Sequence, residues 1–484
     1  MPSDGLAESR QVDQPLLSIL IALYNEEAFI AECLTRVLHA PFAENTSFEI
    51  IVVDDGSSDA SVERVHEIQR QHPCTIRLIR HDRNRGKGAA IRTALEHASG
   101  AFCIIQDADL EYSPLEYPKL LKPLLAGDAD AVIGSRFGFS GERRVLYFWH
   151  AVANRILTTL CDMVADINLT DMETCYKAAR TPLLKSIPLR CDRFGIEPEL
   201  IIKLAQRRAR IYETSISYHG RTYEEGKKIG FKDACKAFLV ILYFGLLKRD
   251  IYKDPGAEIL DTLAAAPRFN GWMADTVRPF LGDSVMEVGA GIGNLAALLC
   301  QRRKRYIASD IDAEHLAYLS ARLEHRPAVE VVPADLERPE DFIPYTDQLD
   351  SVLCLNVLEH VKDDYTGLSN IFRALRPGGR AIVLVPEGMS VFGTLDEVLG
   401  HQRRYSEKEL RDKLQAAGFR IETVLYFNRP TRPGWFVNGR IFKRRRFSRV
   451  QIFVFDRLVW LWRRIDRFLP WKPTSLIAVG IRPS

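Results

Sequence analysis

The chain has 484 residues, of which 46% are hydrophobic and 27% are charged. This length and composition are typical of an ordinary globular protein with two or three domains, and they exclude a disordered or fibrous chain. The net charge of +3 is nearly balanced and indicates no particular class of partner, and no nucleic-acid partner is expected. The nine cysteines form no CxxC pair, which favours reduced thiols in the cytoplasm over disulfides or structural zinc.

Two stretches bear on membranes and targeting. Residues 1–15 are polar and predict a loose tail that lacks the apolar segment of a signal peptide. The longest uninterrupted apolar run, 237–247, has about half the length that spans a bilayer. The chain is therefore not expected to cross a membrane, although the sequence leaves contact with a membrane surface open.

From residue 16 onward, strand-like and helix-like segments alternate. Continuous apolar runs predict buried strands, and the segments between them have the pattern of helices. Such alternation indicates a mostly parallel sheet covered by helices, in which ligands bind beyond the carboxyl ends of the strands. The predicted strands are 16–25, 48–55, 75–81 and 101–109, and the predicted helices are 26–38, 57–71 and 87–98.

Acidic residues follow the last of these strands. Asp107 and Asp109 lie two residues apart, so in an extended chain their side chains share a face and can approach one cation. Glu111 continues the same spacing. Carboxylate oxygens suit Mg²⁺ or Mn²⁺, and a divalent cation neutralises the charge that develops on a diphosphate leaving group. Asp107, Asp109 and Glu111 are therefore predicted metal ligands. Two aspartates at this spacing without further supporting motifs more often belong to a solvated loop.

A wider set of motifs places these aspartates in a family. IALYNEE (21–27), VVDDGSSD (52–59), NRGKGAA (84–90) and QDADLEYSP (106–114) together resemble glycosyltransferase family 2, in particular its dolichol-phosphate mannose synthase branch. The resemblance covers about residues 16–235 and implies a GT-A fold and a nucleoside-diphosphate-sugar donor. Asp55 would contact the base, with Asp54 as the close alternative. The residues implied in donor binding are Leu23, Tyr24, Glu26, Asp54, Asp55, Lys87, Ala108, Arg221 and Lys227.

The same resemblance bears on the acceptor. It places Arg136 near a phosphate, so Asp107, Asp109 and Arg136 are the predicted catalytic residues of this half. A phosphate is already ionised at neutral pH and needs no general base, whereas a hydroxyl usually does. Polyprenyl phosphate is therefore the expected acceptor. A glycan hydroxyl is the alternative, with Asp171 or Glu173 as the base.

A second alternating pattern begins near residue 257. Residues 249–256 are charged and contain a Pro-Gly break, so they predict a linker between domains at 16–248 and 257–484. Two late strands fit a final antiparallel pair. The strands predicted in this half are 284–289, 306–311, 329–335, 349–356, 380–387, 421–427 and 475–481.

The first strand of the second half ends in a glycine-rich turn. Gly289, Gly291 and Gly293 would let the backbone turn tightly and approach a ligand, and Asp310 ends the next strand, where it can accept ribose hydroxyls. This spacing alone would also suit a dinucleotide-dependent dehydrogenase. LCLNVLEHV (353–361) and RPGGRAIVLVP (376–386) resemble class I S-adenosylmethionine-dependent methyltransferases, which implies a Rossmann-like fold. The residues implied in S-adenosylmethionine binding are Glu287, Gly289, Gly291, Gly293, Asp310, Asp335 and Asn356.

Two histidines are candidates for the methyl-transfer chemistry. His360 and His401 could act as a base if the acceptor is a hydroxyl, although a histidine in a helix is more often structural. His401, Arg404 and Tyr405 could contact an anionic or sugar-like acceptor. The alternative for this segment is a capping and packing loop.

A long basic insertion, 428–474, separates the last two strands. In its second part, Phe455, Leu458, Val459, Trp462 and Ile465 fall on one helical face, with arginines on another. Such a helix is typical of an anionic membrane surface. Packing of the same face against a neighbouring domain is the alternative.

Together these patterns predict a two-domain α/β protein, a GT-A domain followed by a class I methyltransferase domain. The expected function is a bifunctional transferase: a sugar moves from a nucleotide-sugar to polyprenyl phosphate, and a methyl group moves from S-adenosylmethionine to a lipid, glycan or other small acceptor. One rival glycosylates a glycan hydroxyl and methylates that product. Another keeps one half as a non-catalytic binding module. The expected location is the cytoplasm, peripherally at the inner face of the membrane.

Overall fold

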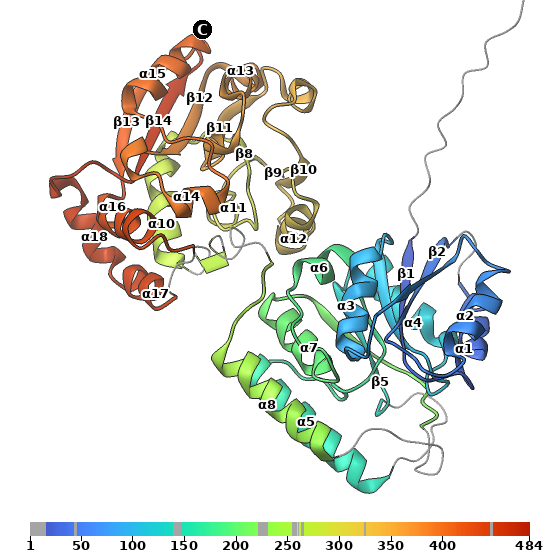
Figure 1. Ribbon diagram of the computed structural model, residues 1–484. Coiled ribbons are helices and arrows are strands. Elements are labelled where there is room, and N and C mark those ends of the chain that lie inside the picture. The colour runs from blue at the N-terminus through green and yellow to red at the C-terminus, as the bar shows by residue number, and fades with distance from the viewer. Residues whose placement is uncertain are drawn as a thin grey trace, which may run out of the picture. The chain divides into compact units, whose positions relative to one another are not determined.

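The protein forms two compact units, Met1–Lys253 and Asp254–Ser484, in the computed structural model (Figure 1). The division falls inside the segment predicted as a linker. The predicted tail, Arg221, Lys227 and part of that linker lie outside the described residues. The structure describes residues 16–42, 46–138, 147–220, 231–253, 259, 261–262, 266–323, 326–445 and 449–484.

The N-terminal unit is built on a seven-stranded sheet with the order β3-β2-β1-β4-β6-β5-β7. β1 to β4 pair in parallel, whereas β6 is antiparallel to both β4 and β5. β1, β2 and β4 are almost wholly buried because both faces of the sheet are covered, which explains their continuous apolar sequences. The strands are β1 Leu17–Leu23, β2 Phe48–Asp54, β3 Ile76–Arg80, β4 Phe102–Asp107, β5 Ala131–Ser135, β6 Lys177–Arg180 and β7 Ile211–Ser215.

Helices enclose this sheet and add a second, smaller core. That core joins α5, α7 and α8 through side chains such as Leu157, Ile201 and Ile241, and α5 and α8 lie side by side in Figure 1. The longer helices are α1 Ile30–Leu38, α2 Ser61–Gln69, α3 Lys87–His97, α4 Tyr117–Leu125, α5 Phe148–Ala165, α6 Thr181–Ser186, α7 Ile196–Gln206 and α8 Phe231–Leu242, which continues as the π-helix η2 Tyr243–Leu247.

The C-terminal unit is also a seven-stranded sheet, with the order β10-β9-β8-β11-β12-β14-β13. The first five strands are parallel, and β14 inserts antiparallel between β12 and β13. The predicted antiparallel final pair is thus present. The strands are β8 Ser284–Val288, β9 Arg305–Asp310, β10 Val329–Pro333, β11 Leu349–Leu355, β12 Leu375–Pro386, β13 Arg420–Phe427 and β14 Ser475–Ile481.

Helices cover both faces of this second sheet, and short turns of helix follow several strands. The turn η6, Leu358–His360, comes directly after β11 and carries part of the site described below. The helices are α10 Pro267–Val277, α11 Ala296–Leu299, α12 Ala313–Leu323, α13 Asp364–Ala374, α14 Thr394–Leu399, α15 Glu407–Ala416, α16 Arg432–Phe436, α17 Arg449–Arg457 and α18 Val459–Ile465.

The amphipathic helix expected in the insertion is broken in the structure. It forms two helices, α17 and α18, that meet at Leu458. Val459 is buried, and Phe455 and Trp462 pack against the aromatic cluster around Phe427 of β13. Much of the predicted apolar face therefore packs within its own domain, an arrangement that differs from both the membrane interpretation and the predicted packing against a neighbouring domain. Within the described residues, no helix combines the length and the apolar character needed to cross a membrane.

Candidate functional site

The donor residues predicted in the N-terminal unit meet at one edge of the sheet. Leu23 at the end of β1 pairs with Asp54 at the end of β2, and Ala22 pairs with Asp107 at the end of β4. Tyr24 follows β1 and is exposed, with Glu26 partly buried next to it, and Ala108 is buried after β4. Parallel strands bring their carboxyl ends together, so residues more than eighty positions apart in the sequence face one ligand-binding edge.

Asp55 shapes the loop before α3. Its carboxylate accepts hydrogen bonds from the backbone N–H groups of Arg85 (2.9 Å) and Gly86 (2.6 Å) and lies 2.7 Å from His81 Nδ1. Gly86 adopts φ = +105°, and a Cβ there would lie 2.3 Å from the carbonyl oxygen of Asp192. Only glycine fits this position. Asp55 thus fixes the NRGKG loop, and the neighbouring Asp54 is buried and accepts from Ser57 N–H and from Arg80.

This loop brings Lys87 next to two carboxylates, those of Asp107 and Glu197. Lys87 Nζ lies 2.7 Å from Asp107 Oδ1 and 3.0 Å from Glu197 Oε1. Although burial opposes both shifts, the pairing raises the pKa of Lys87 and lowers that of Asp107. Lys177 pairs with the other oxygen of Glu197. The result is a buried row of alternating charges that holds Asp107 ionised.

The predicted metal ligands do not all converge. Asp107 and Asp109 both lie close enough to Cys33 for their charges to affect its thiol. Burial, and then these two carboxylates, raise the pKa of that thiol. Two nearby carboxylates and an oxygen-only donor set fit a Mg²⁺ or Mn²⁺ ion. Glu111 instead accepts a hydrogen bond from the Tyr218 hydroxyl at 2.8 Å. Among the described residues, Glu111 does not join Asp107 and Asp109 in one three-ligand group.

Arg136 is held by a carboxylate of its own chain. Its Nε and Nη2 donate to Asp171 at 2.6 and 2.8 Å, and its guanidinium lies 5.1 Å from the centre of the Tyr218 ring. Asp171 is fully buried and also accepts from Asn154. A carboxylate engaged in this way is poorly placed to act as a base. The side chain of Arg136 lies beside Tyr218 and is 15% exposed.

Glu173 differs from Asp171. Its Oε1 atom is buried without a hydrogen-bond partner. Burial, and then the charge of Glu197, raise the pKa of Glu173 to about 7. A carboxyl group with a pKa near neutrality can accept a proton from a hydroxyl acceptor.

The glycine-rich turn of the C-terminal unit has the geometry predicted for it. Gly289, Gly291 and Gly293 all adopt positive φ, at +69°, +55° and +74°. A Cβ on Gly289 would lie 2.4 Å from Val357 Cγ2, whereas a Cβ on Gly291 would meet nothing within 4 Å. Open space at Gly291, beside the carboxyl ends of β8 and β9, leaves room for a ligand to approach the backbone.

Two carboxylates flank this turn. Asp310 accepts from Gly291 N–H at 2.8 Å and contacts His315; these hydrogen bonds hold the pKa of Asp310 low against the effect of burial. Glu287 is buried within β8 and accepts from the Tyr306 hydroxyl at 2.6 Å. Burial raises the pKa of Glu287 to about 7. A cationic group of a ligand beside Glu287 would favour its ionised form. The two residues therefore suit ribose hydroxyls and the methionine ammonium of S-adenosylmethionine.

The other residues implied in methyl-donor binding lie at the same sheet edge. Asp335 follows β10, is partly exposed and accepts from Glu337 N–H. Asn356 follows β11, is exposed and adopts φ = +56°. Since β9 pairs with β8 and β10, and β8 with β11, these residues lie near the turn.

His360 and His401 are brought together with Glu359. The two imidazole rings are 4.9 Å apart in an edge-to-face arrangement. His401 Nδ1 lies 2.9 Å from Asp396 Oδ1, and Arg404 Nε donates to the same oxygen at 2.7 Å. Tyr405 is fully buried and donates its hydroxyl to Asp364. Arg404 and Tyr405 thus make internal contacts, as the packing interpretation of this segment holds.

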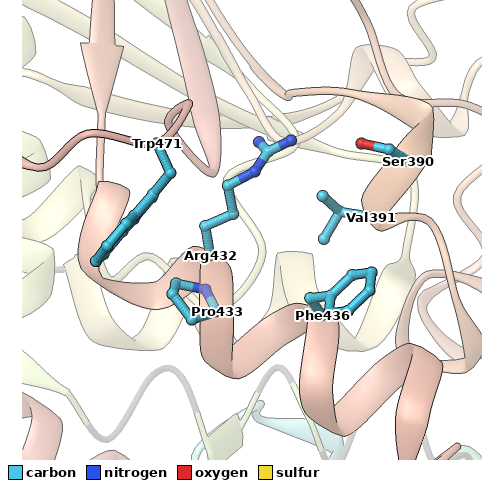
Figure 2. A pocket seen from close by; sticks show the side chains of 6 residues that line it. All are labelled: Ser390, Val391, Arg432, Pro433, Phe436 and Trp471. Atoms are coloured by element: carbon cyan, nitrogen blue, oxygen red, sulfur yellow. The ribbon is translucent and has the colours of Figure 1, made fainter.

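A pocket opens near the end of β12. Figure 2 shows Arg432 between Trp471 on one side and Val391 and Phe436 on the other. The guanidinium of Arg432 lies 2.5 Å from Glu387, the residue that follows β12. Apolar and aromatic walls around one charged group suit a ligand with an apolar or sugar-like face. The residues lining the pocket are Ser390, Val391, Arg432, Pro433, Phe436 and Trp471.

Sequence patterns miss several residues of these sites. Glu197, Lys177 and Tyr218 come from segments with no recognisable spacing to Asp107, so only the fold reveals their contacts. Glu359 lies within the NVLEH motif. An acidic residue inside this apolar stretch is the sequence feature that could have pointed to it. The pocket of Figure 2 combines residues from three separate segments, and no periodicity links them.

Comparison with known proteins finds a family match within each unit. Residues 18–187 match the Glycosyl transferase family 2 profile, and residues 286–383 match the profile of a Methyltransferase domain. The chain is 26% identical over 216 residues to the dolichol-phosphate mannosyltransferase of Pyrococcus furiosus, covering 44% of this chain and 59% of that protein. It is 24% identical over 284 residues to the dodecaprenyl-phosphate galacturonate synthase of Rhizobium johnstonii, covering 58% and 80%.

A third relative is the undecaprenyl-phosphate 4-deoxy-4-formamido-L-arabinose transferase of Aeromonas hydrophila, 27% identical over 215 residues that cover 44% of this chain and 63% of that protein. The chain therefore spans less than two thirds of two of these three relatives. The matches confirm the two predicted resemblances. The N-terminal unit has the GT-A fold, the C-terminal unit has the class I methyltransferase fold, and both are transferase domains.

Proposed function

Because the chain joins a family 2 glycosyl transferase domain to a methyltransferase domain, we propose that it catalyses two transfers. The first moves a sugar from a nucleoside-diphosphate-sugar to polyprenyl phosphate. The second moves a methyl group from S-adenosylmethionine to a lipid, glycan or other small acceptor. The observation that carries the first proposal is the meeting of Asp54, Asp107 and Asp109 at one sheet edge, with Lys87 holding Asp107 ionised.

The donor would bind with its diphosphate near Asp107 and Asp109. A bound Mg²⁺ or Mn²⁺ ion would neutralise charge on the departing diphosphate. Asp107 and Asp109 would hold that ion. Asp55 would support donor binding through the loop it orders, since its own carboxylate is occupied by backbone N–H groups. Arg136, fixed by Asp171 and with a side chain that is 15% exposed, would donate to a phosphate.

Two observations support a phosphate acceptor. All three relatives named above are called dolichol-phosphate, dodecaprenyl-phosphate or undecaprenyl-phosphate enzymes. In addition, the carboxylate of Asp171 is engaged by Arg136 and Asn154, so it offers no free base. A phosphate oxygen attacks without a base, and this fits such a site.

Glu173 supports a second candidate, transfer to a glycan hydroxyl. Its buried oxygen without a hydrogen-bond partner and its pKa of about 7 are the properties of a general base. Replacement of Glu173 by glutamine separates the two candidates, because transfer to a phosphate would survive it and transfer to a hydroxyl would fall by about 100-fold or more.

An exposed apolar face supports access to a lipid-linked acceptor. Trp149, Ile156 and Met163 of α5 are 76%, 60% and 76% exposed and lie seven residues apart, so they form one stripe along the helix. Leu239 of α8 and Leu246 of η2 are also exposed. A large exposed apolar surface marks a binding site for another apolar surface. We infer that α5, α8 and η2 rest on the membrane that holds the acceptor, at the cytoplasmic face.

The methyl donor would occupy the turn at Gly289–Gly293. Bound S-adenosylmethionine would supply the electrophilic methyl group. Glu287 and Asp310 would orient S-adenosylmethionine through its ammonium group and its ribose. The open space at Gly291 would let the ligand approach the protein backbone, and Asp335 and Asn356 would complete the site. Methyl transfer depends mainly on alignment, so these positioning contacts would supply much of the catalysis. The pocket beside Arg432 would hold part of the methyl acceptor.

The test of sugar transfer uses the full chain, a panel of radiolabelled UDP- and GDP-sugars, and polyprenyl phosphate in detergent with Mg²⁺ or Mn²⁺. We expect label in the organic phase, reduced at least 100-fold by Asp109→Asn. Asp128→Asn is the matched control, because Asp128 is an exposed carboxylate after α4. Free labelled sugar, or no turnover with any donor, would refute the proposal.

A further inference from the structure

A second group of potential metal ligands lies in the methyltransferase unit. Glu359 and His360 come from η6, and His401 follows α14. One ligand atom from each lies within 4.8 Å of the others. Within the described part of the chain, this is the one group of three histidine, cysteine or acidic side chains that meets this criterion. It is separate from the carboxylates of the sugar-transfer site.

The carboxylate of Glu359 has no hydrogen-bond partner. Glu359 is completely buried, and both of its side-chain oxygens are without a hydrogen bond. The nearest imidazole nitrogen, His401 Nε2, lies 3.9 Å from Oε1. Burial of a carboxylate without compensation is costly, so such a group requires an explanation, of which a bound cation is one.

His401 is oriented as metal-binding histidines are. Its Nδ1 faces Asp396 at 2.9 Å, and its Nε2 is on the side of Glu359. Asp396 is itself fixed by Arg404 Nε at 2.7 Å and by Trp435 Nε1 at 3.1 Å. A carboxylate that receives the outer N–H of a histidine sets the tautomer and directs the other nitrogen to a metal ion.

The second histidine lies beside the first. The centres of the His360 and His401 rings are 4.9 Å apart, and one ring nitrogen of His360 lies within 4.8 Å of the ligand atoms of Glu359 and His401.

We propose that Glu359, His360 and His401 bind one divalent transition-metal ion through a carboxylate oxygen and two imidazole nitrogens. Imidazole ligands favour Zn²⁺, Mn²⁺, Fe²⁺ or Co²⁺ over Mg²⁺ and Ca²⁺, which prefer oxygen ligands alone. Three protein ligands are the set of catalytic metal sites, in which a further position is open to water or substrate.

The position of this site suggests what the open coordination position binds. The η6 turn follows β11 directly, and Val357, two residues before Glu359, contacts the position of a Cβ on Gly289 in the methyl-donor turn. If methyl transfer occurs as proposed above, the metal would bind an acceptor hydroxyl and promote loss of its proton to water. The oxygen would then form the bond to the methyl carbon while the carbon–sulfur bond breaks and its electron pair stays on sulfur. The acceptor class is thus an alcohol or phenol.

The test measures metal binding without turnover. The untagged full chain is freed of metal and titrated with Co²⁺ in excess Mg²⁺, which occupies the oxygen-ligand site, and binding is followed by the visible absorption of Co²⁺. We expect one Co²⁺ per chain and competition by Zn²⁺. Glu359→Gln and His401→Gln are each expected to weaken binding at least 10-fold, whereas His97→Gln, at an exposed histidine of α3, is not.

Binding of S-adenosylmethionine to each variant shows that the domain is folded. Absence of saturable Co²⁺ binding in the wild-type chain, or equal binding by Glu359→Gln, would overturn the metal site. If metal binds but no methyl transfer to alcohols or phenols is found, the metal site stands and the proposed acceptor class fails. Failure of sugar transfer bears on neither result.

Discussion

The glycine-rich turn of the methyltransferase unit can be tested as the methyl-donor site by comparing alanine substitutions at two glycines. We expect only one of the two substitutions to affect contact with the ligand. Gly291 has φ = +55° and Gly378 has φ = +77°, and a Cβ on either would meet nothing within 4 Å. Alanine at either position costs the strain of the left-handed conformation, about 1–2 kcal/mol. In a domain of this size that cost lowers Tm by about 2–8 °C. Gly291→Ala and Gly378→Ala should therefore destabilise the protein to a similar extent.

The two variants should differ when S-adenosylmethionine is added. At Gly291 the new methyl group projects into the space that we assign to the ligand, whereas Gly378 is exposed and lies near the start of β12, before the regular pairing with β11 that begins at Arg380. We expect isothermal titration to show at least 10-fold weaker binding to Gly291→Ala, a loss of about 1.4 kcal/mol, and unchanged binding to Gly378→Ala. Equal affinities in the two variants would refute the assignment of this turn to the methyl donor.

Three further predictions concern other parts of the chain. Without a ligand, the folded protein holds a proton on Glu287 up to about pH 7, whereas the unfolded chain releases it near pH 4.5. The free energy of unfolding should therefore fall as the pH rises between these values. Urea titrations at pH 5 and pH 8 should show that Glu287→Gln removes roughly 1–3 kcal/mol of that fall. A difference between the two proteins that does not change with pH would contradict this. Arg136→Lys should cost about 1–3 kcal/mol in the same assay, because lysine cannot make both bonds to the buried Asp171, whereas Arg36→Lys, at an exposed pair, should cost under 1 kcal/mol. Trp149→Ser should weaken flotation with anionic vesicles about 10-fold, since burial of a large apolar side chain contributes about 1.5–3 kcal/mol, and an equal loss for Phe453→Ser on α17 would move the contact to the insertion.

The sequence predicts the parallel halves of both sheets well, for a physical reason. Strands buried on both faces carry continuous apolar runs, and β1, β2, β4 and β11 contain such runs. By contrast β6, Lys177–Arg180, is a four-residue antiparallel strand containing a lysine and an arginine. Its burial depends on β4 and β5, which lie far away in the sequence, so no local pattern reveals it.

The candidate sites show the same contrast between features with a local sequence pattern and features that depend on distant residues. The spacing of Asp107 and Asp109 and the glycines at 289–293 are local features, and the structure places them at sheet edges as expected. The roles of Asp55 and Glu111 depend on partners such as Gly86 and Tyr218, which the sequence does not link to them. The amphipathic pattern at 454–471 is real, but its apolar face packs against α10 and β13 of its own domain.

The most direct test of the account follows both transfers in one reaction. The chain is incubated with a membrane extract, a ¹⁴C-labelled nucleotide-sugar and S-adenosylmethionine carrying a tritiated methyl group. We predict that both labels leave the aqueous donors and that Asp109→Asn lowers transfer of the sugar label to the organic phase about 100-fold or more. With S-adenosylmethionine below saturation, Gly291→Ala should lower methyl transfer about 10-fold or more while sugar transfer continues. Sugar transfer that persists in Asp109→Asn, or methyl transfer unaffected by Gly291→Ala, would contradict the claim that this chain carries two separate transferase sites.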